Sequence, residues 1–280
     1  ALGLDKDLNN LENLTEKIHN YGFVSSLIST SEITHATPAA FAAHVDLRWK
    51  TDEISKQMID SDVMTILGGG RHFFLPEEMG GKRDDGLNLY EQVESTQTLI
   101  THKDQLNDVN VISSNKVIGL FADEHLRDID KPDNHSSEPT TEDMLDFAIK
   151  RSESFMENGC KGSFIMVEGS QIDWGGHDNS LNYVLSEFKE FDLAIAKALE
   201  FAKADGNTLV IVTADHETGG MALSGGNVKR SRVRADFTSG SHTGTMVPVF
   251  SYGPYSNLFR GIYDNTAIFD KMLTAINGER

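Results

Sequence analysis

The sequence of 280 residues predicts an α/β fold, a three-layer α/β/α sandwich built around a mainly parallel central sheet. Short apolar runs typical of buried strands alternate along the chain with longer segments of helical periodicity. Several of these runs are almost continuously apolar, as expected for parallel strands that are covered on both faces. Acidic and histidine residues follow two of the runs, at the edge of the sheet where such folds bind ligands.

The strands are predicted where β-branched and aromatic residues gather in short runs. In chain order they are residues 23–28, 63–67, 109–112, 117–121, 163–167, 208–212 and 247–251. The helices are predicted where apolar residues recur every three or four positions, at residues 38–48, 141–156, 180–203 and 266–276. Thr140 and Asp143 form a weak capping signal for the second helix, and Asn179 or Ser180 can cap the third. The apolar stripe of residues 184–199 indicates a core-facing helix.

Composition limits both the class of protein and its partners. Hydrophobic residues make up 39% and charged residues 24% of the chain, which is typical of one globular domain over residues 1–280. No apolar run approaches the roughly 20 residues of a membrane helix, and no basic and apolar leader segment follows Ala1. The net charge of −18 argues against nucleic acid as a partner. The lone Cys160 excludes an internal disulfide and a cysteine-based zinc site.

Two acidic-histidine runs carry the most functional information. They are Val-Glu-Gly-Ser-Gln-Ile-Asp-Trp-Gly-Gly-His at residues 167–177 and Thr-Ala-Asp-His-Glu-Thr-Gly-Gly at residues 213–220. One acidic residue after a strand is more often a helix N-cap or a solvated charge, and one histidine is more often a packed residue. Several such residues after two strands favour a divalent-metal site, with zinc at mixed nitrogen and oxygen ligands and magnesium where oxygens dominate.

Two irregular stretches carry less functional information. Gly-Gly-Gly-Arg at residues 68–71 lacks the Gly-Lys-Ser/Thr ending of a nucleotide phosphate loop, which favours a surface excursion after a strand. Residues 219–240 are rich in Gly, Ser and Arg, and we expect a small irregular lobe there, near the site.

The two runs resemble the metal-binding signatures of alkaline phosphatases. Three further blocks resemble the family in the same order: Thr-His-Ala-Thr-Pro-Ala-Ala-Phe-Ala-Ala-His at residues 34–44 with Arg48, residues 68–71, and Ser-His-Thr-Gly at residues 241–244 with the Val-Pro-Val and Tyr-Gly-Pro that follow. The resemblance implies two zinc ions (Zn2+) and one magnesium ion (Mg2+). By motif, the implied metal ligands are Asp173, His177 and His242 for the first zinc, Asp215 and His216 for the second, and Glu168 and Thr37 for magnesium.

The resemblance also implies a substrate-binding set. Arg48 matches the arginine that holds two phosphate oxygens, whereas without the resemblance a surface charge at a helix end would be the better interpretation. His35 and Trp174 stand where the enteric members carry Asp and Lys, as in bacterial members that pair His with Trp. The implied ligands are phosphate monoesters and inorganic phosphate, with no nucleic acid or membrane partner. A homodimer with a periplasmic or extracellular location is also implied.

The family's nucleophile motif, Asp-Ser-Ala followed by Thr-Ala, does not occur among these residues. Residues 1–5 resemble the family segment that follows the nucleophile helix, so the serine nucleophile is expected upstream of Ala1, and the chain alone is expected to be inactive or very weak. Ser61 has the wrong surrounding motif and precedes a strand. Two alternatives stay open: a metal- or phosphate-binding fragment without catalysis, and a related metallo-phosphodiesterase.

Overall fold

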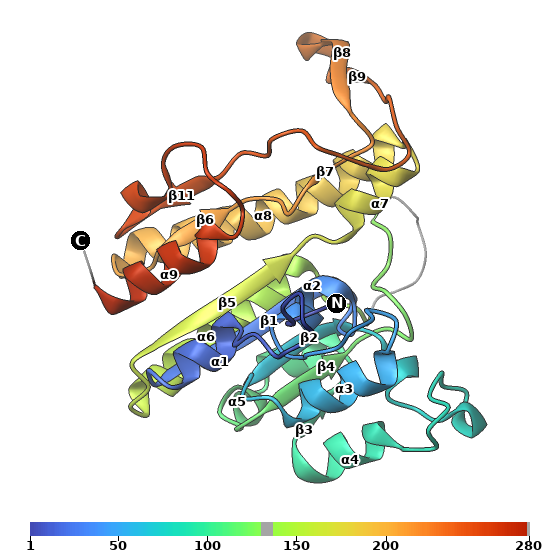
Figure 1. Cartoon of the computed structure of the whole chain (residues 1–280), viewed down its shortest axis with the longest axis vertical. Coiled ribbons are helices and arrows are strands. Elements are labelled where there is room, and N and C mark those ends of the chain that lie inside the picture. Colours follow the sequence, from blue (N-terminus) through green and yellow to red (C-terminus); the bar gives the residue numbers. More distant parts are fainter. Residues whose placement is uncertain (130–136, 279–280) are drawn as a thin grey trace. The chain divides into compact units, whose positions relative to one another are not determined.

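The computed structural model describes residues 1–129 and 137–278, and its chain divides into two compact units, residues 1–170 and 171–280. Each unit is described by itself below, with the element labels of Figure 1. The helices and strands of the first unit are α1 (Leu14–His19), β1 (Phe23–Glu32), α2 (Ala36–Ala40), α3 (Thr51–Asp60), β2 (Thr65–Gly69), α4 (Leu89–Thr96), β3 (Thr98–Ile100), α5 (Val109–Ile112), β4 (Val117–Leu120), α6 (Thr141–Glu157) and β5 (Gly162–Glu168). Short 3-10 turns lie at Arg71–Phe73, Glu77–Met79 and Lys103–Asn107.

The first unit is built on a five-stranded sheet in the order β3-β4-β2-β1-β5, and every neighbouring pair in it is parallel. Its longest strand, β1, pairs with β2 on one side and with β5 on the other. In the second register Ser29 lies opposite Glu168, the last residue of β5. The predicted α/β fold with a mainly parallel sheet is therefore confirmed.

Helices cover both faces of this sheet. On one face Leu27 and Ile66 belong to a core cluster with residues of α3 and α4, among them Met58 and Val93. Successive side chains of a strand point to opposite faces, so Thr65 points away from that cluster. There its hydroxyl accepts a 2.8 Å hydrogen bond from Nε of Arg151, which belongs to α6. The two helix layers and the sheet between them form the expected three layers.

The second unit contains two long helices and several short strand pairs (Figure 1). Its elements are α7 (Gln171–His177), α8 (Leu181–Asp205), β6 (Val210–Val212), β7 (Glu217–Thr218), β8 (Ala222–Asn227), β9 (Arg232–Asp236), β10 (His242–Thr243), β11 (Phe250–Tyr252) and α9 (Ala267–Asn277), with 3-10 turns at Val228–Arg230 and Ser256–Phe259. The pairs β6–β11, β7–β10 and β8–β9 are all antiparallel. Residues 219–240, predicted as an irregular lobe, include the β8–β9 hairpin.

Two predicted elements differ from the structure. Residues 109–112 form the helix α5 and not a strand, because the Asp108 side chain accepts a hydrogen bond from the Asn110 N–H and so caps a helical turn. The helix predicted at 38–48 ends as α2 at Ala40, since Val45 exchanges two backbone hydrogen bonds with Leu2 at 2.8 and 3.0 Å. This extended pairing is incompatible with a continued helix.

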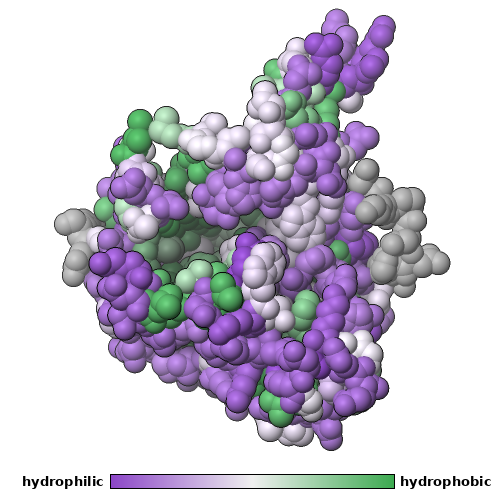
Figure 2. Space-filling model, turned by 45° about the vertical axis from the view of Figure 1, so that its right-hand side comes forward, coloured by the Kyte–Doolittle hydropathy of each residue, from purple (hydrophilic) through white to green (hydrophobic). Residues whose placement is uncertain are grey.

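None of the helices in the described segments has the length and apolar character needed to cross a bilayer. Hydrophilic residues dominate the face visible in Figure 2. Exposed large hydrophobic side chains, such as Trp49 at 77% and Val228 at 97%, do occur. Isolated side chains of this kind are normal on soluble proteins and carry no functional argument by themselves.

Candidate metal centre

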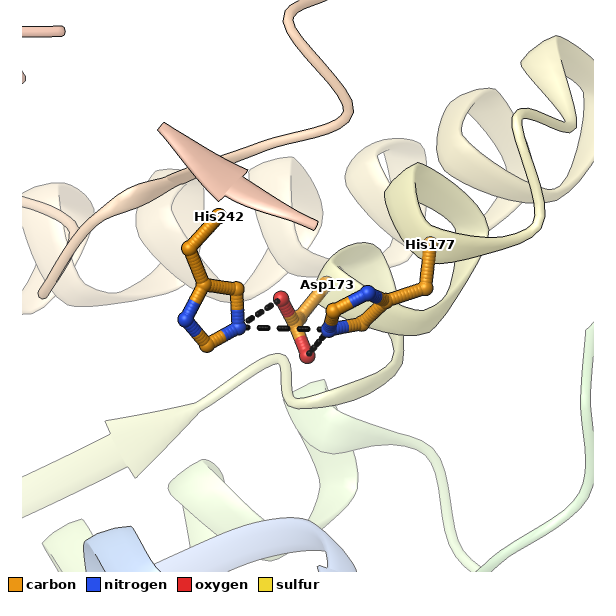
Figure 3. Close-up of side chains that lie close together, drawn as sticks. All are labelled: Asp173, His177 and His242. Carbon is orange, nitrogen blue, oxygen red and sulfur yellow. Dashed lines mark hydrogen bonds and ion pairs between the residues drawn. The ribbon is translucent and has the colours of Figure 1, made fainter. Parts of the chain in front are cut away.

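Asp173, His177 and His242 converge in the second unit (Figure 3). Asp173 and His177 are four residues apart on α7, so they lie on one face of the helix. His242 comes from β10, which pairs with β7. Nε2 of His177 lies 3.4 Å from Oδ2 of Asp173 and 3.2 Å from Nε2 of His242, and Nε2 of His242 lies 3.5 Å from Oδ1 of Asp173. A single ion can contact all three side chains.

The ring of His177 is oriented by a backbone contact. Its Nδ1–H donates a 2.9 Å hydrogen bond to the carbonyl oxygen of Gly240, so in the neutral ring Nε2 carries the lone pair. This lone pair faces the carboxylate of Asp173 and the ring of His242. Electron-rich atoms this close repel one another unless a proton or a cation lies between them. Two nitrogens and one carboxylate, about one-third to one-half exposed, are the donors expected of an open zinc site.

Asp215 and His216 lie beside this cluster in the same unit. The ring of His216 stacks on that of His242 with 3.6 Å between centroids, and Nε2 of His216 is 3.2 Å from Oδ2 of Asp215. Asp215 is more exposed, at 72% of its side chain. The two residues predicted to hold a second ion therefore lie next to a ligand predicted for the first.

Thr218 was missed by the sequence analysis, although it lies in the second acidic-histidine run. Its hydroxyl donates to Oδ1 of Asp173, and its oxygen lies 3.2 Å from Nδ1 of His216. Because the only hydroxyl hydrogen goes to Asp173, the oxygen can accept from Nδ1–H of His216. That tautomer leaves Nε2 of His216 as the lone pair that faces Asp215. One threonine thus contacts one residue of each predicted zinc ligand set.

Glu217 fixes the backbone that carries these residues. The Thr243 hydroxyl donates to its carboxylate, and the backbone N–H groups of Met221 and Gly220 donate to it as well, each at 3.1 Å. These hydrogen bonds hold the pKa of Glu217 below its usual value, and the bond from Thr243 has the largest effect. Glu217 is therefore engaged as an anion in joining β7 to β10.

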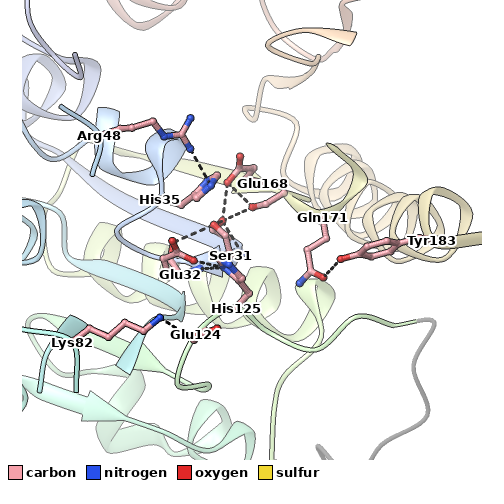
Figure 4. Close-up of polar contacts among 12 residues, drawn as sticks. Ser31, Glu32, His35, Arg48, Lys82, Glu124, His125, Glu168, Gln171 and Tyr183 are labelled. Carbon is pink, nitrogen blue, oxygen red and sulfur yellow. Dashed lines mark hydrogen bonds and ion pairs between the residues drawn. The ribbon is translucent and has the colours of Figure 1, made fainter. Parts of the chain in front are cut away.

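The remaining predicted residues, apart from Trp174 on α7, lie in the first unit (Figure 4). His35 is the N-cap of α2, and Thr37 is in that helix. Nη2 of Arg48 donates a 3.0 Å hydrogen bond to Nε2 of His35, which makes this nitrogen an acceptor. Glu168 closes β5 and accepts hydrogen bonds from two serines. Among the residues that the structure describes, His, Cys, Asp and Glu side chains form no second three-residue cluster like that of Asp173.

A second histidine, which the sequence analysis also missed, lies near His35. The ring of His125 meets that of His35 edge to face with 6.2 Å between centroids (Figure 4). Its Nδ1 accepts a 3.2 Å hydrogen bond from the Glu32 backbone N–H and contacts the Glu32 carboxyl. Burial, with a smaller effect of His35, lowers the pKa of His125 to about 4, and burial raises the pKa of Glu32. Each of the two shifts favours the neutral form of its group.

Comparison with known proteins gives one consistent result. The sequence profile of the family described as "Alkaline phosphatase" matches residues 1–234. Alkaline phosphatase 4 of Bacillus subtilis is 31% identical over 95% of this chain and 70% of its own length, and the alkaline phosphatase of Escherichia coli is 29% identical over 99% and 70%. Among solved structures, the alkaline phosphatase of the Antarctic bacterium TAB5 is 38% identical with a TM-score of 0.86, covering 99% of this chain and 78% of that one. A cold-active enzyme from Shewanella is 26% identical with a TM-score of 0.82 over 98% and 80%.

Proposed function

Because the chain belongs to the alkaline phosphatase family of phosphomonoester hydrolases, we propose that it binds two zinc ions and one magnesium ion, and that phosphate monoesters are the ligands of its site. The observation that carries the proposal is the convergence of Asp173, His177 and His242 on one point, with His216 stacked beside them. Three such donors fit the first zinc, and Asp215 with His216 fit the second. Glu168 and Thr37 offer oxygen donors, as magnesium prefers.

The residues present would perform the binding steps of the reaction. A phosphomonoester is a dianion, and transfer of its phosphoryl group depends mainly on positioning and charge neutralisation. The planar guanidinium of Arg48 can donate to two phosphate oxygens. Its hydrogen bond to His35 holds the guanidinium in position. When bound, the zinc ions would add positive charge and acidify water. Trp174 is proposed to contact the substrate as well.

No serine of residues 1–280 stands in the family's nucleophile motif, so we propose that this chain by itself binds phosphate but turns monoesters over very slowly or not at all. In the structure the Ser61 hydroxyl donates a 2.8 Å hydrogen bond to the Met58 carbonyl at the end of α3, which is a capping role. Turnover of p-nitrophenyl phosphate in mild alkali, with zinc and magnesium added, tests this. A family-typical rate from residues 1–280 would show that they contain a nucleophile.

Binding experiments test the site without requiring turnover. Zinc titration should show one tight site in the parent chain and its loss in His242→Ala. His19 is an exposed histidine of the first unit, so His19→Ala should bind zinc like the parent. Inorganic phosphate should bind Arg48→Ala about 10- to 100-fold more weakly, as expected for the loss of paired charge-assisted hydrogen bonds. The exposed Arg260→Ala is the matched control. Equal zinc affinity in the parent, His242→Ala and His19→Ala would contradict the proposed zinc centre.

A structure of the TAB5 enzyme in which a histidine is replaced by glutamate has magnesium bound in the site called M3. A magnesium site in the present chain is a proposal that rests on Glu168 and Thr37. We further propose a homodimer that works in the periplasm or outside the cell, from the family alone. Light scattering of the purified protein tests the first statement, and cell fractionation tests the second.

A further inference from the structure

Three buried serines surround the carboxylate of Glu168 in the first unit (Figure 4). Ser29 and Ser31 lie on β1 and are fully buried, and Ser170, two residues beyond the end of β5, is 5% exposed. The parallel register places Ser29 directly opposite Glu168. Polar groups in such a position need hydrogen-bond partners. The partners found here are the other serine hydroxyls, one oxygen of the Glu168 carboxylate and, for Ser31, the Glu32 carbonyl oxygen.

Two of the serine hydroxyls reach the same oxygen of the carboxylate. Ser29 Oγ and Ser170 Oγ each lie 2.7 Å from Oε2 of Glu168 and can donate to it, and the two Oγ atoms lie 2.8 Å from each other. Ser29 Oγ also accepts from the Ser31 backbone N–H at 3.3 Å. The Ser31 hydroxyl can donate to Ser29 Oγ at 2.8 Å or to the Glu32 carbonyl oxygen at 3.1 Å.

We propose that Ser29 and Ser170 are positioning residues that occupy Oε2 of Glu168 and present Oε1 alone to a divalent cation, with Ser31 in contact with Ser29 behind them. The inference rests on the proposed function, which assigns Glu168 to magnesium. Two donors on one oxygen fix the plane of the carboxylate. Magnesium demands near-octahedral geometry and is commonly held through one oxygen of each carboxylate, so a fixed plane with one available oxygen suits it.

An alternative is that the hydroxyls merely satisfy one another inside the sheet. The two readings differ in magnesium affinity, because contacts that orient a ligand side chain commonly contribute about 10- to 100-fold to metal binding. Ser26 provides a matched control. It is a serine of the same strand, 4% exposed, and takes no part in the cluster.

The test is calorimetric titration of the 280-residue chain with Mg2+ alone at fixed ionic strength. Glu168→Gln defines the weak binding by other carboxylates. We expect Ser29→Ala and Ser170→Ala each to weaken the Glu168-dependent binding, the double variant to weaken it about 10- to 100-fold, and Ser26→Ala to leave it unchanged. Ser170→Thr, which keeps the hydroxyl, should bind nearly as well as the parent. If the double variant does not fold, Ser170→Ala, at the exit of the strand, decides the matter.

Parental magnesium affinity in folded Ser29→Ala and Ser170→Ala would overturn the inference. Equal affinity in the parent and Glu168→Gln would overturn it too, together with the assignment of magnesium to Glu168. Failure of the zinc and phosphate experiments with His242→Ala and Arg48→Ala would instead reject the proposed function, and a loss of magnesium binding in the serine variants would still support the positioning role. The two failures are therefore separable.

Discussion

At the scale of single residues, the Thr218 hydroxyl contacts one residue from each of the two predicted zinc ligand sets. It donates to Asp173 on α7, and it can accept from His216, the residue that precedes β7. Both contacts use the same oxygen. Loss of that oxygen should therefore affect both predicted zinc positions together.

We expect Thr218→Val, which keeps the shape of the side chain but removes the hydroxyl, to weaken zinc binding about 10- to 100-fold. Thr218→Ser should retain most of the affinity. Competition with a coloured chelator measures both variants. Unchanged zinc affinity in a folded Thr218→Val protein would show that the hydroxyl orients nothing of importance to the metal.

A second residue-scale prediction concerns Lys116, whose ammonium donates to the carbonyls of Met58, Ile59 and Ser61 at the end of α3, at 2.9, 2.7 and 2.6 Å. Burial lowers the pKa of Lys116 from 10.5 to about 8. Between these two pH values the unfolded chain holds a proton that the folded chain has released. Stability should therefore rise from pH 8 to 10.5, with an upper limit on the order of 3 kcal/mol from this group.

Urea unfolding at a series of pH values measures this effect. We expect Lys116→Met to remove the rise in the free energy of unfolding, and the exposed Lys6→Met to preserve it. The slope with pH is the informative quantity, because losing the hydrogen bonds to the helix end also lowers stability at every pH. The same slope in Lys116→Met and in the parent would rule out Lys116 as its source.

The residue types of the centre could be predicted from the sequence, but their hydrogen-bond partners could not. Asp173 and His177 are four positions apart, and His242 stands in a recognisable motif. Thr218 and the carbonyl of Gly240 are recognised only when β7 and β10 are paired, since each acts across a long sequence separation. Ser29 and Ser170 lie 141 positions apart and meet only through the register of β1 and β5.

At the scale of elements, the run of glycines at the end of β2 has a packing explanation. A Cβ at Gly69 would lie 1.9 Å from the Glu124 carbonyl oxygen, and one at Gly68 would lie 2.8 Å from a methyl of Ile33 and 2.9 Å from two β1 carbonyl oxygens. The backbone N–H groups of Gly70 and Arg71 both donate to the Ala122 carbonyl, at 3.1 and 3.0 Å. These glycines let neighbouring backbones approach closely, and they are not arranged around a phosphate.

We expect Gly69→Ala to lower the free energy of unfolding by about 3 kcal/mol, at the upper end of the range for overpacked sites, because a backbone carbonyl must move. Gly244→Ala is the matched control, since a Cβ there meets no atom within 4 Å. Chemical denaturation compares the two variants with the parent. A Gly69→Ala protein as stable as Gly244→Ala would mean that the loop after β4 yields easily.

The long helices could be predicted from the sequence, and some of the short helices could not. The 17 residues of α6 and the 25 of α8 show sustained periodicity, which outweighs local preferences. In α5 a single capping aspartate outweighs the strand preference of Val109 and Ile112. The helix α7 was also missed, because its two glycines weaken a helical pattern that packing against α8 stabilises.

At the scale of the whole molecule, the predicted ligands are divided between the two compact units. Asp173, His177 and His242 and the pair Asp215 and His216 all belong to residues 171–280. Glu168, Thr37, His35 and Arg48 all belong to residues 1–170. A ligand that binds the folded state stabilises what it touches, so each kind of ion should stabilise its own unit first.

Hydrogen–deuterium exchange with and without zinc tests this division. We expect zinc to slow exchange in α7, β7 and β10 and to leave β2, β4 and α3 nearly unchanged. In the His242→Ala variant, zinc should not slow exchange in α7, β7 or β10. Equal protection of β2 and β10 by zinc would mean that the two units unfold as one cooperative body.

The separation of His177 and His242 along the chain has a consequence for folding. The two rings are 65 positions apart in sequence, and their Nε2 atoms are 3.2 Å apart. A metal ion held between them would act as a removable cross-link in a chain whose lone Cys160 forms no disulfide. A permanent covalent link that closed a loop of this length would lower the conformational entropy of the unfolded chain. This loss would stabilise the folded state by about 4 kcal/mol. The availability of zinc would then determine how strongly this cross-link stabilises the protein. Scarcity of the metal would lower the stability of residues 178–241 as well as the occupancy of the zinc site.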